Sequence, residues 1–206
     1  MKYKNVIWDF DGTLFNSYPA MIESFMMALR EKDIEEDTKT IETLMKISVP
    51  TVIEYIQNKY NCSDDVVNRF NEIRKDIEIK KCIPYEDTLS TLQFIINQGG
   101  SNFIFTHRDK STIEILKQYS MHSLFTECVT KEYGFERKPS PDGINYLIDK
   151  YNLDKKETIM IGDRELDILS GNNANIDSCF FNNENKTNCS LATFSINCLS
   201  KIKEKN

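Results

Sequence analysis

The feature that most constrains the fold is a series of short apolar runs separated by stretches in which apolar residues recur at helical spacing. These runs have the length and composition of buried strands. They occupy residues 6–8, 102–105, 127–130, 158–161 and 176–181, with a weaker sixth candidate at 192–196. Strands that alternate with helices along a chain form a parallel sheet covered by helices on both faces. The sequence therefore predicts an α/β protein with a Rossmann-like parallel sheet core.

One long helical block interrupts this alternation after the first predicted strand. Apolar side chains recur there at helical spacing in four successive stretches, the first of which contains Met21, Phe25 and Leu29, and no strand pattern intervenes. We therefore expect a core domain made of residues 1–15 and 83–206, with an all-helical cap domain at 16–82 inserted into it. Residues 16–19 and 81–85 would be the two linkers, about which the cap closes over the site and excludes water.

Composition excludes several classes of function. Hydrophobic residues make up 40% of the 206 residues, which is enough for a substantial core, and the net charge of −6 argues against nonspecific binding to nucleic acid. No apolar run has the length of a membrane span, and no signal-peptide core precedes the first predicted strand, so a cytoplasmic protein is expected. The polar segment 182–188 predicts a surface loop.

The six cysteines are scattered without a CxxC pair, which is typical of free thiols in a cytoplasmic protein. The two histidines, His107 and His122, have no cysteine at metal-ligand spacing. We therefore do not expect a zinc site.

Two acidic residues directly follow the first predicted strand, in the segment Trp8-Asp9-Phe10-Asp11-Gly12-Thr13-Leu14. Asp9 and Asp11 lie two positions apart, so on an extended backbone their carboxylates lean the same way and repel each other unless a cation or a proton intervenes. Gly12 allows a sharp turn there. An Asp-Gly turn after a strand is common, so the segment alone leaves catalysis and a simple turn both open.

Other polar residues follow the remaining predicted strands. Thr106 follows the second, Asp163 follows the fourth with Asp167 one helical turn later, and Lys138 precedes the helix that follows the third. Because the carboxyl ends of parallel strands meet at one edge of a sheet, these side chains are expected to converge there with Asp9 and Asp11. Such an acidic pocket suits Mg²⁺, and with Lys138 its field becomes favourable to a phosphate, to which Thr106 can donate a hydrogen bond. The chemistry expected is phosphoryl transfer to a carboxylate, followed by hydrolysis of the aspartyl phosphate.

Four segments resemble the motifs of the haloacid dehalogenase superfamily, in order and at family spacing. They are Asp9-Phe10-Asp11-Gly12-Thr13-Leu14, Thr106, Lys138-Pro139 and Gly162-Asp163-Arg164-Glu165-Leu166-Asp167. The helical insert resembles the cap of the phosphoglycolate phosphatase and β-phosphoglucomutase branch. The resemblance implies that Asp9 is the nucleophile and Asp11 the general acid and base.

The same resemblance implies the roles of the other motif residues. Thr106 and Lys138 would bind the transferring phosphate, and Lys138 would also orient Asp9. Mg²⁺ would be held by the Asp9 carboxylate, the Asp11 backbone carbonyl and Asp163. Asp167 would either bind the ion or lie one layer behind its ligands.

Three further residues have more than one interpretation. His107 is a candidate phosphate-binding residue or proton carrier, but a structural hydrogen-bonding role is favoured. Arg108 could contact an anionic substrate, but pairing with a carboxylate is favoured. The predicted cap has no basic cluster that would clamp a substrate; Lys46 is the nearest candidate, with a plain surface charge as the alternative.

The function predicted is a Mg²⁺-dependent phosphatase that acts on a small phosphorylated metabolite. A phosphosugar mutase of the β-phosphoglucomutase type is the alternative, because the cap decides whether water reaches the aspartyl phosphate. A silent regulatory binding protein is disfavoured because all the motif residues are present. A dehalogenase is disfavoured because dehalogenases of this fold lack the second motif aspartate, here Asp11. Sequence leaves the substrate and the oligomeric state open.

Overall fold

The computed structural model describes residues 2–62, 64–183 and 189–205. The chain divides into two compact units, of which the first contains Met1–Phe15 with Pro84–Asn206 and the second contains Asn16–Ile83. The sequence pattern placed these boundaries after residues 15 and 82. That the second unit acts as a cap stays a prediction, and most of the predicted loop 182–188 lies outside the described residues.

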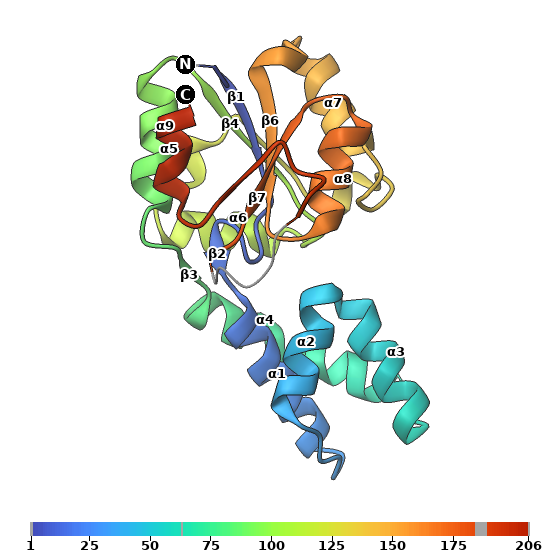
Figure 1. The fold of residues 1–206 in the computed structure, drawn as a ribbon. Helices are drawn as coiled ribbons and strands as arrows, with labels where there is room; N and C mark the ends of the chain where they lie inside the picture. The colour runs from blue at the N-terminus through green and yellow to red at the C-terminus, as the bar shows by residue number, and fades with distance from the viewer. Residues whose placement is uncertain (1, 63, 184–188, 206) are drawn as a thin grey trace. The chain divides into compact units, whose positions relative to one another are not determined.

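The first unit is built on a parallel sheet with strand order β5-β4-β1-β6-β7-β8 (Figure 1). Every pairing in it is parallel, and in the centre Trp8 lies opposite Ile104 on one side and Ile161 on the other. The predicted α/β class with a Rossmann-like sheet is confirmed. The strands are β1 (Asn5–Trp8), β4 (Ser101–Phe105), β5 (Glu127–Val129), β6 (Thr158–Gly162), β7 (Asp177–Phe181) and β8 (Phe194–Ile196).

Helices cover both faces of this sheet, with α5 and α9 on one face and α7 and α8 on the other (Figure 1). On the second face Ile7, Phe105 and Met160 pack with Ile144 and Leu147 of α7 in one buried cluster. Val6 and Trp8, whose side chains point to the opposite face, are buried as well, as expected of a strand in a sheet covered on both faces. The helices of this unit are α5 (Thr88–Asn97), α6 (Ser111–Gln118), α7 (Asp142–Tyr151), α8 (Glu165–Asn173) and α9 (Ile202–Lys205), with 3-10 turns η1 (His122–Leu124), η2 (Lys131–Tyr133), η3 (Lys155–Glu157) and η4 (Leu199–Lys201).

On the opposite face the buried side chain of Asn102 links three elements. The Trp8 indole N–H donates to Asn102 Oδ1 at 3.0 Å, and Asn102 Nδ2 donates to the Leu92 carbonyl of α5 at 3.1 Å. Because buried polar groups need partners, Asn102 ties β1 and β4 to α5 in one register.

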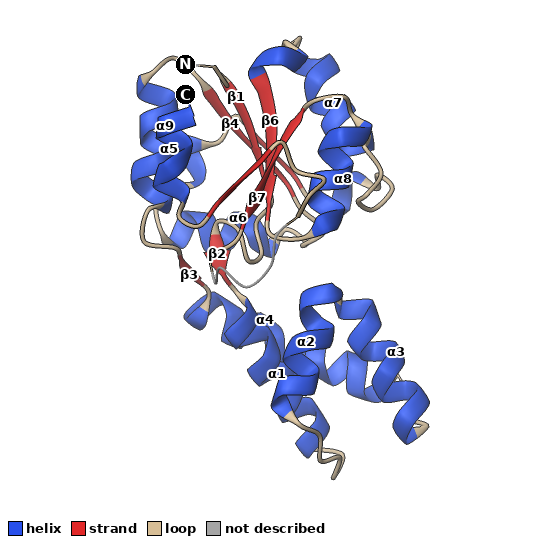
Figure 2. Cartoon of the chain, in the orientation of Figure 1, coloured by secondary structure: helices blue, strands red, loops and turns tan. Residues whose placement is uncertain are grey.

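The second unit is helical throughout its described residues, as Figure 2 shows. α1 packs along α4, where the Phe25 and Phe70 rings meet edge to face at 5.1 Å, and α2 packs on α1 and α3. Pro19 and Pro50 lie in the first turns of α1 and α3, where a missing N–H does no harm. The helices are α1 (Tyr18–Arg30), α2 (Thr38–Ile47), α3 (Val49–Tyr60) and α4 (Asp65–Lys81).

Two very short strands, β2 (Phe15–Asn16) and β3 (Ile83–Pro84), pair where the chain passes between the units. They are too short to show a periodicity, so sequence reasoning missed them.

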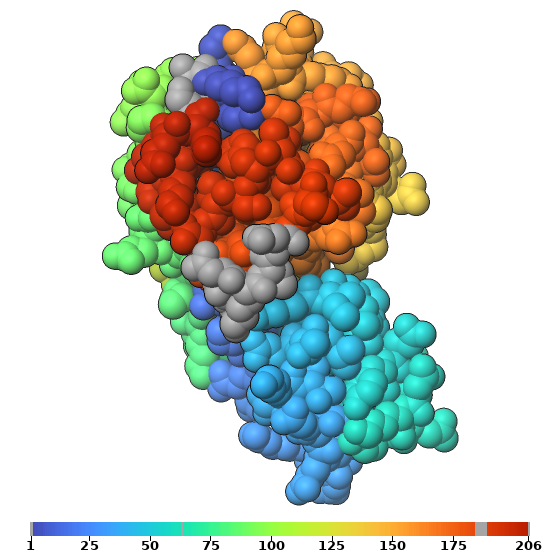
Figure 3. Space-filling view, viewed as in Figure 1, coloured from blue at the N-terminus to red at the C-terminus, as the bar shows by residue number. Residues whose placement is uncertain are grey.

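The two ends of the described chain lie side by side on the first unit, as the space-filling view in Figure 3 shows. The Tyr3 ring lies 6.1 Å from the Phe194 ring of β8, and its hydroxyl donates to Asp177 at 2.7 Å. All six cysteines are free thiols. Among the described residues, no helix combines the length and the hydropathy of a membrane span.

Candidate active site

The parallel sheet brings three of the predicted site residues to one edge. Asp9, Thr106 and Asp163 directly follow β1, β4 and β6, and these three strands are neighbours. The ladder continues past the strand ends, because the Asp9 N–H donates to the Ile161 carbonyl at 2.8 Å and the Thr106 N–H to that of Val129 at 3.0 Å. The side chains of Asp9 and Thr106 therefore project from backbone that is hydrogen-bonded to the sheet.

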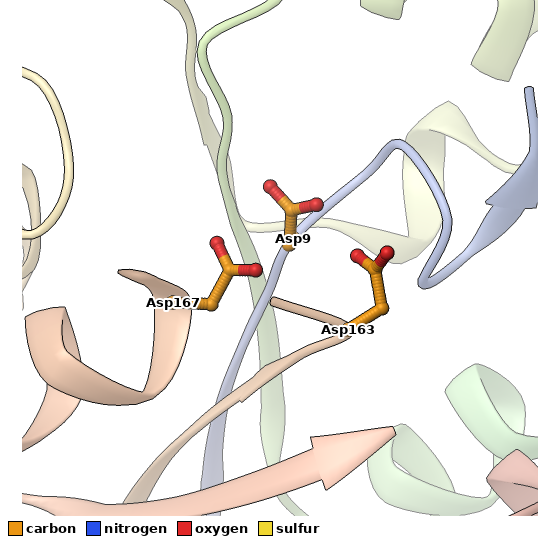
Figure 4. A group of neighbouring side chains, drawn as sticks. All are labelled: Asp9, Asp163 and Asp167. Carbon is orange, nitrogen blue, oxygen red and sulfur yellow. The ribbon is translucent and has the colours of Figure 1, made fainter. Parts of the chain in front are cut away.

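Three carboxylates gather at this edge, those of Asp9, Asp163 and Asp167. One oxygen from each lies within 4.8 Å of the others, and Figure 4 shows the three groups turned toward one another. Asp9 and Asp167 are fully buried, whereas Asp163 is partly exposed and accepts a hydrogen bond from the Thr13 hydroxyl at 3.1 Å. Asp167 reaches the group from the first turn of α8.

Lys138 lies between two of these acids. Its Nζ is 2.5 Å from Asp9 Oδ1 and 2.7 Å from Asp167 Oδ1, and none of its side chain is exposed. The ammonium group also lies 5.0 Å from the centre of the Phe105 ring. Buried charges persist only when they are paired in this way. Lys138 therefore fixes Asp9 and Asp167 relative to each other.

The two buried acids have pKa values displaced in opposite directions. Burial, reinforced by the negative charge of Asp167 and opposed by Lys138, raises the pKa of Asp9 to about 6. Burial also acts to raise the pKa of Asp167, but the positive charges of Lys138 and Arg164 outweigh it, so that the pKa of Asp167 is lowered. Asp9 is thus the more basic carboxylate of the two, which suits a nucleophile.

The residues present fit a hard divalent cation. Asp9 Oδ2 is buried and has no hydrogen-bond partner among the described residues, although the Asp163 and Asp167 carboxylates adjoin it. The possible ligands are all carboxylate oxygens, which Mg²⁺ prefers, and the group contains no histidine or cysteine for zinc. Asp9 and Asp163 are the residues best placed to hold such an ion, because both oxygens of Asp167 are engaged, one by Lys138 Nζ and the other by the Arg164 N–H, whereas Asp9 has one oxygen without a hydrogen bond from a described residue.

The Asp11 carboxylate does not belong to this group. It pairs with Arg108, whose Nε lies 3.1 and 3.2 Å from its two oxygens and whose Nη2 lies 2.7 Å from Oδ1. In the structure Arg108 therefore pairs with a carboxylate, which is the interpretation favoured from the sequence. Of the four aspartates expected to gather, Asp9, Asp163 and Asp167 have adjoining carboxylates, whereas the guanidinium holds the carboxylate of Asp11. That these acids bind a cation stays a prediction. The contact predicted for the Asp11 backbone carbonyl stays a prediction.

His107 supports the backbone beside Lys138. Its Nε2 accepts a hydrogen bond from the Lys138 N–H at 2.7 Å. Burial, with the charges of Lys138, Arg137 and Arg164, lowers the pKa of His107 to about 3, so the ring is neutral. This contact favours the structural role over a cationic phosphate ligand. Thr106 Oγ1 accepts from the Arg108 N–H at 3.1 Å, which leaves its hydroxyl hydrogen to donate.

Two arginines near the acids were missed by sequence reasoning. Arg164 Nη2 lies 3.9 Å from Asp9 Oδ2, and its backbone N–H donates to Asp167 Oδ2 at 3.1 Å. Arg137 precedes Lys138, and burial together with the charge of Arg164 lowers the pKa of Arg137. The sequence signal that could have identified them is their position, since Arg164 directly follows Asp163 and Arg137 directly precedes Lys138.

Lys46, the candidate in the second unit, forms an ion pair with Glu42 of the same helix at 3.0 Å. Its Nζ also lies 6.0 Å from the centre of the Tyr18 ring. Both contacts are those of an ordinary surface charge.

Gly162 leaves room for the buried acid behind it. A Cβ atom there would lie 2.2 Å from the Asp167 Cβ. We expect Gly162→Ala to displace Asp167 from Lys138 and to lower the free energy of unfolding by about 1–3 kcal/mol in urea titrations. Gly134→Ala is the control, because its Cβ meets nothing within 4 Å and only its φ of +72° is unfavourable, at about 1 kcal/mol. Equal stabilities of Gly162→Ala and the wild type would contradict this account of Asp167.

Residues 6–181 match the family described as haloacid dehalogenase-like hydrolase. The pyrophosphatase PpaX of Bacillus mycoides is 29% identical over 185 residues, which cover 84% of this chain and 81% of the relative. The pyrophosphatase PpaX of Anoxybacillus flavithermus is 27% identical over 178 residues, with the same shares covered.

Two solved structures are also similar to this chain. A hydrolase from Streptococcus pneumoniae is 34% identical, with a TM-score of 0.67 over 88% of this chain and 94% of that one. A predicted phosphoglycolate phosphatase from Haemophilus somnus superposes with a TM-score of 0.86 over 100% of this chain and 98% of that one, at 19% identity. At this low identity, the similarity to the Haemophilus somnus structure shows only a shared fold.

Proposed function

This chain belongs to the family of haloacid dehalogenase-like hydrolases and is a phosphatase, and we propose that it hydrolyses a small phosphorylated metabolite with Mg²⁺ through a phosphorylated Asp9. The observation that carries the proposal is that the Lys138 ammonium group binds both Asp9 and Asp167, next to Asp163. The other oxygen of Asp9, Oδ2, has no hydrogen-bond partner among the described residues. A buried carboxylate oxygen of this kind is available to attack phosphorus.

The reaction proceeds in two displacements. Asp9 Oδ2 forms a bond to phosphorus as the bond to the leaving oxygen breaks, and Asp11 supplies the proton for that oxygen. Water then attacks the aspartyl phosphate, its proton passes to Asp11, and the bond from phosphorus to Asp9 breaks. Lys138 and the Thr106 hydroxyl stabilise the phosphoryl oxygens through charge and hydrogen bonding. Mg²⁺ bound by Asp9 and Asp163 would supply positive charge that offsets that of the phosphate.

Inorganic pyrophosphate is the first substrate to test. The relatives named above are called pyrophosphatases. Arg164 lies 3.9 Å from the attacking oxygen, Arg137 is its electrostatic neighbour, and such a pair suits a second phosphate group. The mutase alternative, a cytoplasmic location and the absence of a nucleic-acid partner stay predictions.

A panel of substrates with and without metal tests the proposal. Hydrolysis of pyrophosphate, phosphoglycolate, p-nitrophenyl phosphate or sugar phosphates, measured as released phosphate, should require Mg²⁺ and stop in excess EDTA. Thr13→Val, which removes the hydroxyl that orients Asp163, should raise the Mg²⁺ concentration for half-maximal rate by about 10-fold. Thr193→Val is its control, because the Thr193 hydroxyl accepts a hydrogen bond from the Ser178 N–H of β7, away from the acids. Undiminished turnover in the chelator would end the proposal.

A further inference from the structure

The ion pair between Arg108 and Asp11 differs from the exposed pairs on the rest of the described chain. Two nitrogens of the guanidinium reach one carboxylate, with a shortest distance of 2.7 Å, in the fork geometry that fixes both position and direction. Only 1% of the Arg108 side chain and 19% of that of Asp11 is exposed. A buried forked pair orients its carboxylate far more strictly than a solvated one.

Arg108 is itself held on several sides. Its N–H donates to Thr106 Oγ1 at 3.1 Å, its carbonyl accepts from the Lys131 N–H at 2.9 Å, and its Nη1 donates to Ser111 Oγ at 3.3 Å. The guanidinium carbon also lies 5.4 Å from the centre of the Phe10 ring. Because these contacts fix Arg108, its guanidinium group also fixes the Asp11 carboxylate that it binds.

All of these groups belong to the first unit of the chain. These contacts orient the Asp11 carboxylate from within that unit. The carboxylate is also kept out of the group formed by Asp9, Asp163 and Asp167, where a cation would compete for it.

We propose that Arg108 is a positioning residue, which directs the Asp11 carboxylate to accept the proton of the water that attacks the aspartyl phosphate. The inference rests on the proposed function, in which Asp9 carries the phosphoryl group and Asp11 moves protons. In that step the water oxygen bonds to phosphorus, the bond to Asp9 breaks, the proton goes to Asp11 and phosphate leaves. A base that is oriented in advance favours prompt hydrolysis over the long-lived aspartyl phosphate that a mutase needs.

Rapid mixing with p-nitrophenyl phosphate and Mg²⁺ separates the two displacements. Nitrophenolate leaves without a proton, so formation of the aspartyl phosphate should change little in Arg108→Ala. Hydrolysis of the aspartyl phosphate should slow about 10- to 100-fold. The variant should therefore release a burst of nearly one nitrophenolate per protein, and acid quenching should trap the phosphorylated chain. Millimolar guanidinium chloride should restore part of the hydrolysis rate, which a purely structural role would not allow.

Two further variants complete the experiment. Arg108→Lys keeps the charge but cannot form the fork, so its hydrolysis rate should lie between those of the wild type and Arg108→Ala. Arg69→Ala removes an arginine with the same forked geometry toward Glu31, at 2.5 and 2.9 Å on the surface of the second unit, and should behave as the wild type.

Three outcomes would overturn the positioning role. The first is a wild-type rate of aspartyl phosphate hydrolysis in Arg108→Ala. The second is an Arg108→Ala variant in which both displacements slow equally, the Tm is lowered and guanidinium has no effect. The third is a wild-type rate of aspartyl phosphate hydrolysis in Arg108→Lys. The lysine variant decides the matter if the alanine variant does not fold. Failure of the proposed function has a different signature, because neither the wild type nor Arg108→Ala would then yield a trapped aspartyl phosphate, and Asp9→Asn would retain turnover.

Discussion

Replacing Asp9 with asparagine is expected to lower kcat by at least about 10⁴-fold, because no other carboxylate can take its place as nucleophile between Lys138 and the partly exposed Asp163. Asparagine has the same shape and still accepts a hydrogen bond from Lys138, which also keeps its 2.7 Å contact with Asp167. The fold should therefore persist. Released phosphate measured with pyrophosphate and p-nitrophenyl phosphate, beside a circular dichroism spectrum, checks both statements.

The same variant has a distinct effect on stability, which is best measured in EDTA. The pKa of Asp9 is raised from 3.8 to about 6, so between these pH values the folded state holds a proton that the unfolded state has released. Wild-type stability from this group therefore falls as pH rises from about 4 to 6, by on the order of 2 kcal/mol. Asp9→Asn lacks the titrating group and should lose that part of the pH dependence in urea titrations.

Asp177→Asn is the matched control for this variant. Asp177 accepts hydrogen bonds from Tyr3 and Lys2 at the other end of the sheet, at 2.7 and 3.0 Å, and its loss should leave kcat unchanged. Turnover by Asp9→Asn within tenfold of the wild type would contradict the role of Asp9 as nucleophile.

Replacing Lys138 with methionine is expected to cause the largest loss of stability of any single change at this site. Methionine fills a similar volume but leaves Asp9 and Asp167 buried and facing each other without the ammonium group that joins them. Breaking a buried ion pair by removing one partner costs about 3–5 kcal/mol. Urea titrations in EDTA at pH 7 should show this loss, and kcat should fall by about 10²-fold or more because a preorganised charge beside the phosphate is gone.

Two comparisons show whether the loss comes from buried charge. Adding Asp167→Asn to Lys138→Met removes one of the stranded carboxylates and should recover a large part of the stability. Lys4→Met removes an exposed pair with Glu157, in which the two side chains are 52% and 36% exposed, and should cost less than about 1 kcal/mol. A loss in Lys138→Met no larger than that in Lys4→Met would show that Lys138 does not hold the acids together.

Much of the fold was predictable because its determinants are local. The strand that ends at Trp8 and the one that ends at Gly162 are recognisable as short apolar runs, and their alternation with helices implies a parallel sheet. That rule alone puts Asp9, Thr106 and Asp163 at one edge. The paired strands at Phe15–Asn16 and Ile83–Pro84 were not predictable, since each is made by a partner far away in the sequence.

By itself, then, the sequence determined which side chains meet at the edge of the sheet, because strand direction depends on patterns only a few residues long. Only the tertiary structure decided which of those charges pair: Lys138 with Asp9 and Asp167, Arg108 with Asp11, and the His107 ring with the backbone of Lys138. Pairing depends on the register between strands and on side-chain directions set by packing around each charge. The residues that flank an aspartate or a lysine in the sequence specify neither the strand register nor the direction of the side chain.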